Sequence, residues 1–114
     1  MGTTDDPREL AHTVVRLHGE YDLARAGEVR ERLYRAVDEG LPIVIDLSEA
    51  TFLDTVTLGI ILEGVRRSRR SRRDVLIYLP DSTAQQVREL FRITGFDGVL
   101  PVIKHWATTE ALGR

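Results

Sequence analysis

Two neighbouring polar residues, Asp54 and Thr55, lie where an apolar run gives way to a helical pattern. An aspartate at the start of a helix accepts hydrogen bonds from free backbone N–H groups, which makes it a favoured N-cap. A hydroxyl beside it would lie at the positive end of the helix dipole, where phosphate is stabilised. These residue types at this spacing fit a structural cap or a phosphorylation site, and both roles can hold together.

A second acidic residue, Asp22, ends the stretch Gly19-Glu20-Tyr21-Asp22, which follows a β-rich run. The glycine and the polar residues predict a turn here. Asp22 is then a plausible N-cap for the helix that follows.

Arginine is concentrated in the stretch Arg66-Arg67-Ser68-Arg69-Arg70-Ser71-Arg72-Arg73. One interpretation is a solvated helix end, because cations suit the negative end of the helix dipole. The other is a surface that contacts an acidic face of a partner protein. The run has no interleaved aromatic residues and the chain's net charge is −2, so we expect no direct nucleic-acid partner.

The other residue types that carry chemistry form no recognisable set. The three histidines are scattered without metal-ligand spacing, and the chain has no cysteine. There is no phosphate-binding glycine-rich loop and no serine, histidine and acid arrangement. We therefore expect no metal, no cofactor and no enzymatic activity.

Length and composition predict one soluble domain over residues 1–114, since the chain is 42% hydrophobic and 30% charged. Residues 1–10 are mostly polar and predict a loose N-terminal segment. No apolar run approaches the ~20 residues that span a bilayer, and the N-terminus lacks a signal-peptide pattern. We expect a cytoplasmic protein without a membrane partner.

The elements that would position Asp22, Asp54 and Thr55 follow from periodicity and turn residues. Three strands and a short edge strand are predicted at 13–18, 41–47, 75–79 and 99–103. Helices with apolar residues three and four apart are predicted at 23–39, 57–70 and 82–94, with a brief terminal helix at 108–112.

Details of the ends of these elements can be tested separately. The first helix would carry Leu23 on its inner face, and Ser82 with Gln85 would form a capping box for the third. Residues 48–51 would be a connector after the second strand. Strands that alternate with helices predict an α/β fold, with a mostly parallel or mixed sheet of about four strands packed against helices.

The order of these motifs resembles a known family. A strand, Gly19-Glu20-Tyr21-Asp22, a helix, an apolar strand and then Phe52-Leu53-Asp54-Thr55-Val56-Thr57-Leu58-Gly59 are similar to a STAS domain. More narrowly, the pattern resembles a bacterial anti-sigma factor antagonist, also called an anti-anti-sigma factor. The resemblance extends from about Thr13 to Ile103.

The resemblance implies a function by partner switching. In that family, a hydroxyl residue directly after the switch aspartate is phosphorylated by an anti-sigma factor that is a serine/threonine kinase. The unphosphorylated protein binds the anti-sigma factor and frees a sigma factor for transcription. Residue by residue, the match implies phosphorylation of Thr55. It implies a partner-binding surface listed as Asp22, Asp54, Thr55, Val56 and Thr57.

The sequence departs from the family pattern at three of these positions. Threonine replaces the usual serine at 55, and Val56 and Thr57 replace a small polar residue and a glycine. A β-branched pair makes this turn stiffer and bulkier. The alternative function is a STAS scaffold or sensor module that is not phosphorylated and binds a protein or a small anionic ligand at the same helix start.

Overall fold

The computed structural model describes residues 13–106 of the chain. The α-helices and strands in this part, in chain order, are β1 (Thr13–Tyr21), α1 (Ala26–Glu39), β2 (Ile43–Leu53), α2 (Thr55–Arg70), β3 (Val75–Tyr78), α3 (Gln85–Thr94) and β4 (Val102–Ile103). Two short 3₁₀ helices, η3 (Leu23–Arg25) and η4 (Phe96–Gly98), precede α1 and follow α3. The predicted loose segment at 1–10 and terminal helix at 108–112 lie outside the described residues.

The four strands form one sheet in the order β1-β2-β3-β4, and every neighbouring pair is parallel. Parallel neighbours need crossover connections, which α1 and α2 provide for the first three strands. This confirms the predicted α/β class and the parallel sheet. The short strand β4 lies at an edge of the sheet, as Pro101 predicts.

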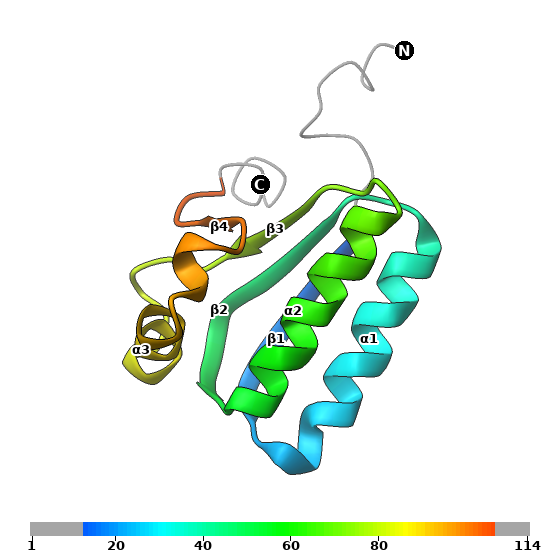
Figure 1. Ribbon diagram of the computed structural model, residues 1–114. Helices are drawn as coiled ribbons and strands as arrows, with labels where there is room; N and C mark the ends of the chain where they lie inside the picture. The colour runs from blue at the N-terminus through cyan, green and yellow to red at the C-terminus, as the bar shows by residue number, and fades with distance from the viewer. Residues whose placement is uncertain (1–12, 107–114) are drawn as a thin grey trace, which may run out of the picture.

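In Figure 1, α1 and α2 lie side by side over one face of the sheet, and α3 lies apart from them. Helix α3 packs against β2. The core forms where these helices meet the sheet. Its fully buried members include Leu17, Ile45, Leu47 and Ile77 from the strands and Val29, Leu33, Ile61, Val65, Val87 and Phe91 from the helices. Leu62, predicted to be buried, is only partly so.

Two predicted loops turn out to be strand. β1 continues through Gly19 to Tyr21, and β2 continues through residues 48–51 to Leu53. These two extensions pair with each other, and the pairing shifts register after Arg16 and again after Gly19. Gly19 has a φ of 86°, a conformation that glycine adopts without steric cost, so the strand accommodates the irregularity there.

The starts of the first and third helices also differ from prediction. Residues 23–25 form the 3₁₀ turn η3 before α1 begins, and Leu23 is 68% exposed instead of facing the core. Helix α3 begins at Gln85 with Ala84 as N-cap and without a side-chain cap, so the predicted Ser82 capping box does not form. The predicted C-terminal caps are confirmed, since Gly40 and Gly95 are both left-handed.

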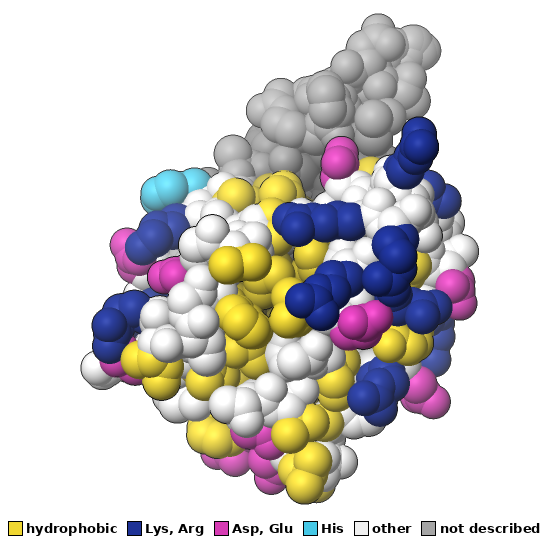
Figure 2. All heavy atoms as spheres, in the orientation of Figure 1, with side chains coloured by type: hydrophobic (Ala, Val, Ile, Leu, Met, Phe, Trp, Pro, Cys, Tyr) yellow, Lys and Arg dark blue, Asp and Glu magenta, His cyan; other side chains and the backbone are white. Residues whose placement is uncertain are grey.

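The arginine stretch covers the last turns of α2 and the residues after it. Figure 2 shows Lys and Arg side chains gathered over the C-terminal halves of α1 and α2. Among residues 13–106, no helix has the length and apolar character that a membrane crossing requires.

Candidate functional site

Two strand ends bring the acidic residues of the predicted site to the same edge of the sheet. Tyr21, the last residue of β1, pairs with Leu53, the last residue of β2. The strands are parallel, so the next residues, Asp22 and Asp54, both follow the carboxyl edge of the sheet. A hydrogen bond from the backbone N–H of Asp54 to the carbonyl of Tyr21, at 3.2 Å, fixes this arrangement.

Asp54 is the N-cap of α2, as the sequence predicts. Its backbone is extended, with φ −96° and ψ 175°, and its Oδ1 accepts a hydrogen bond of 2.8 Å from the N–H of Thr57. Its carbonyl accepts the first helical bond, from the N–H of Leu58 at 3.1 Å. One free N–H at the start of the helix is therefore satisfied, and the carboxylate is held at the positive end of the helix dipole.

Thr55 and Val56, the first two residues of α2, are both exposed, and the Val56 side chain keeps 46% of its accessible surface. Thr57 is 0% exposed, and its Oγ1 donates a hydrogen bond of 3.2 Å to the carbonyl of Tyr21. The predicted partner surface is therefore corrected at Thr57, because this side chain faces inward. Of the two threonines, only Thr55 has an accessible side chain.

Asp22 is exposed and caps the short turn η3, because its Oδ1 accepts a hydrogen bond of 3.0 Å from the N–H of Ala24. The predicted capping role is confirmed, although α1 itself begins later, at Ala26. Leu23 follows Asp22 with most of its side chain in solvent. Exposed apolar and acidic groups thus alternate along this edge.

Gln86, which sequence analysis did not single out, holds the end of β2. Its Oε1 accepts a bond of 3.0 Å from the N–H of Leu53, and its Nε2 donates a bond of 2.8 Å to the carbonyl of Leu53. The side chain takes the place of a strand neighbour, because β3 pairs with β2 only as far as Asp46. No local pattern identifies Gln86, since its partner is 33 residues away in sequence.

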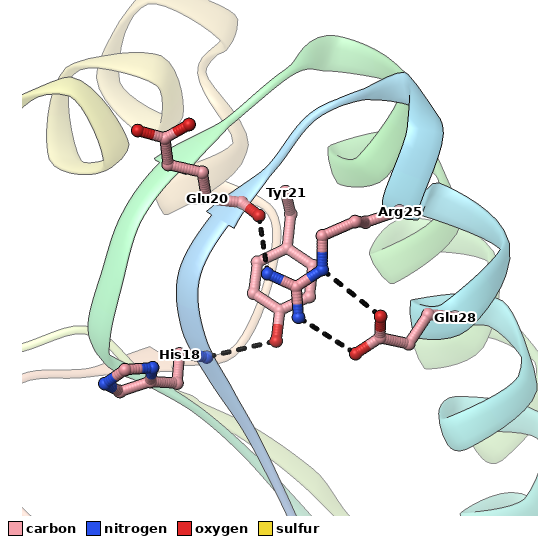
Figure 3. Close-up of polar contacts among 5 residues, drawn as sticks. All are labelled: His18, Glu20, Tyr21, Arg25 and Glu28. Carbon is pink, nitrogen blue, oxygen red and sulfur yellow. Dashed lines mark hydrogen bonds and ion pairs between the residues drawn. The ribbon is translucent and has the colours of Figure 1, made fainter.

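A second cluster supports the end of β1, as Figure 3 shows. The guanidinium of Arg25 lies 4.0 Å from the centre of the Tyr21 ring and donates a bond of 2.8 Å to the carbonyl of Glu20. It also pairs with the carboxylate of Glu28. The hydrogen bond from Arg25 lowers the pKa of Glu28, and the same contact raises the pKa of Arg25. The Tyr21 hydroxyl accepts from the N–H of His18 at 3.1 Å.

The site offers an exposed hydroxyl, two carboxylates and the start of a helix of 16 residues. Within residues 13–106, no group of three or more His, Cys, Asp or Glu side chains is placed to hold a metal ion. Fold and site together define a small α/β domain whose surface for ligand, partner or modification lies at the carboxyl ends of its parallel strands.

The chain belongs to the STAS domain family, whose model matches residues 4–110. It is 30% identical over 96 residues to the anti-sigma-B factor antagonist of Listeria monocytogenes, covering 83% of this chain and 82% of that protein.

Solved structures agree on the fold. The phosphorylated form of the Bacillus cell fate determinant SpoIIAA matches with a TM-score of 0.64 and 21% identity, over 92% of each chain. An anti-sigma factor antagonist from Mycobacterium paratuberculosis matches with a TM-score of 0.70 and 24% identity, over 92% of this chain and 89% of that one.

Proposed function

We propose that this protein is an anti-sigma factor antagonist that binds an anti-sigma factor kinase and is released when Thr55 is phosphorylated. Its role is then regulatory, in the cytoplasm, through control of sigma-factor-dependent transcription. Binding would use the edge that carries Asp22, Asp54, Thr55 and Val56.

The exposure of Thr55 beside the capped Asp54, with Thr57 buried, is the observation that carries this proposal. A kinase needs a hydroxyl that it can reach. Thr57 already donates its hydroxyl proton to Tyr21 within the core, whereas Thr55 lies at the surface in the first turn of α2. The departure from the family pattern at residue 57 therefore leaves a reachable hydroxyl at 55.

Phosphorylation at this position can break a complex without unfolding the domain. The start of α2 tolerates an anion, because free N–H groups and the helix dipole favour negative charge. The phosphate adds a charge of about −1.5 to −2 close to Asp54 at an edge that already carries Asp22. A partner packed on this edge would have to desolvate all three groups, so the phosphate disfavours the complex.

The relatives support both parts of the proposal. The Listeria protein is named as an antagonist of an anti-sigma factor. The Bacillus protein of the same fold is known in a phosphorylated and an unphosphorylated form. A domain of this shape therefore accommodates a phosphate.

The direct test is to incubate the chain with ATP and its cognate anti-sigma kinase and to locate phosphate by mass spectrometry. We expect one phosphate on Thr55 and none in Thr55→Ala. The matched control is Thr57→Val, which should still be phosphorylated at residue 55. An unmodified wild-type chain that still binds its partner would contradict the switch and favour the scaffold function.

A further inference from the structure

The second feature that the proposed switch does not use is the arginine surface, defined as Arg66, Arg67, Arg69, Arg70, Arg72 and Arg73. These residues lie at the C-terminal end of α2 and in the turn that follows. Figure 2 shows the cationic side chains on one face of the molecule, over the ends of α1 and α2. Thr55 is at the opposite end of α2, which at 1.5 Å per residue is about 24 Å long.

Most of this positive charge is not neutralised within the domain. Arg70 pairs with Glu63 at 3.2 Å. Within residues 13–106, Arg66, Arg69 and Arg72 make no hydrogen bond or ion pair, and Arg66, Arg69 and Arg72 are all exposed. A single cation or two would suffice for the helix dipole, whose effect is confined to the last turn. The remaining charges have no structural partner.

A hollow adjoins these charges. It has a volume of about 420 Å³ and is lined by Val37 and Asp38 at the end of α1 and by Arg67, Arg70 and Ser71 of α2 and its C-cap. The Arg67 guanidinium is held over the Tyr34 ring, 4.3 Å from its centre. The Nε of Arg67 is buried and has no hydrogen-bond partner within the described part of the chain. Arg67 is thus held in place by stacking and keeps an unused donor.

Arg72 breaks a local rule of the backbone. Its φ is 61°, in the left-handed region that glycine or asparagine occupies at lower cost. A helix that needed only to end here would be better served by glycine. An arginine at this position adds charge to the surface at the expense of local stability, which is typical of a functional position.

We propose that the arginine surface is a second docking site, which binds an acidic protein segment whose carboxylates pair with Arg66, Arg69 and Arg72. The charges are all guanidinium groups, which bind carboxylates in a two-point geometry. Nucleic acid fits less well, because Asp38 and Glu63 interrupt the surface and Tyr34 is covered by Arg67 and cannot stack on bases. This inference stands independently of the switch at Thr55.

The distance between the two sites gives the proposal a specific consequence. Exposed charges separated by more than about 10 Å are largely screened at ordinary salt. A phosphate on Thr55 therefore leaves the arginine surface unaffected. One partner region can stay bound at the end of α2 while another is released from its start.

Fluorescence anisotropy with a fluorescein-labelled oligoglutamate peptide tests the proposal on the full chain. The variant is Arg66→Gln/Arg69→Gln/Arg72→Gln. The matched control, Arg30→Gln/Arg92→Gln/Lys104→Gln, removes the same charge from exposed cations elsewhere. We expect the wild type to bind, the variant to lose about tenfold in affinity and the control to lose less than about twofold. Thr55→Glu should bind as the wild type does.

Several results would overturn the proposal. They are the absence of binding to the peptide at low salt, and an equal loss in the variant and the control. Tighter binding of a single-stranded oligonucleotide of equal charge would assign the surface to nucleic acid. Self-association of the wild type that the triple variant abolishes would assign it to a second copy of the chain. A large loss in Thr55→Glu would show that the two sites are not independent.

Discussion

The hydroxyl of Thr57 donates a hydrogen bond to the carbonyl of Tyr21 at 3.2 Å, and this buried contact joins the first turn of α2 to the end of β1. The same carbonyl accepts from the N–H of Asp54. One backbone oxygen therefore fixes the residues on both sides of the Thr55–Val56 pair. The exposed threonine is presented on a supported turn, so its modification changes the surface without disturbing the core.

Removing the Thr57 hydroxyl should cost stability. Thr57→Val keeps the shape of the side chain but loses the bond to Tyr21 and buries a methyl in its place. We expect the free energy of unfolding in urea to fall by about 1 kcal/mol. Thr55→Val makes the same change at an exposed position and should stay within about 0.5 kcal/mol of wild type. Equal losses in the two variants would mean that the buried bond contributes nothing.

The Gln86 side chain should protect the end of β2. Gln86→Ala removes both hydrogen bonds to Leu53. We expect a loss of about 1–2 kcal/mol in unfolding free energy and faster hydrogen exchange at the Leu53 amide. The control is Gln85→Ala, at an exposed neighbouring position, which should change neither quantity appreciably. An unchanged exchange rate in Gln86→Ala would refute the clamp.

The Arg25–Glu28 pair should make part of the stability depend on pH. Arg25 lowers the pKa of Glu28 below its ordinary value of 4.5 in the folded state. The ionised pair therefore stabilises the fold above that value, and this contribution disappears as the pH falls through the folded-state pKa.

We accordingly expect Arg25→Gln to lower the urea midpoint at pH 7 and to lower it less at a pH that protonates Glu28. The cation–π contact and the bond to Glu20 persist at both pH values, so some loss remains in acid. Arg30→Gln, on the same helix, should have a small effect that does not change between the two pH values. A pH-independent loss in Arg25→Gln would contradict a role for Glu28.

The sequence predicts the sheet and helices well where the signal is local. Apolar spacing locates the cores of α1, α2 and α3, and the apolar runs locate the first parts of β1 and β2. It fails at residues 19–21 and 48–51, which are polar or glycine-containing and are strand only because they pair with each other. That pairing joins segments about 30 residues apart, which no local pattern reveals.

The candidate site follows the same rule. The capping roles of Asp22 and Asp54 depend on neighbours two and three residues away and could be predicted. The burial of Thr57 depends on Tyr21, which is 36 residues away, so its assignment to the partner surface was wrong. Leu23 faces solvent because the turn η3 separates it from the helical stripe of α1.

The central claim is that phosphate on Thr55 releases the anti-sigma partner. Binding of the wild type and of Thr55→Ala to the anti-sigma kinase is to be measured with and without ATP. Thr55→Ala leaves Asp54 as N-cap and the Thr57 bond intact, so it should fold and bind as the wild type does. Thr55→Glu, which adds one charge and fewer acceptor oxygens than phosphate, should weaken binding in part.

The decisive measurement is the fraction of each protein that stays bound after ATP is added. We predict that ATP releases the wild type and leaves Thr55→Ala bound. Release of both proteins to the same extent would contradict Thr55 as the switch.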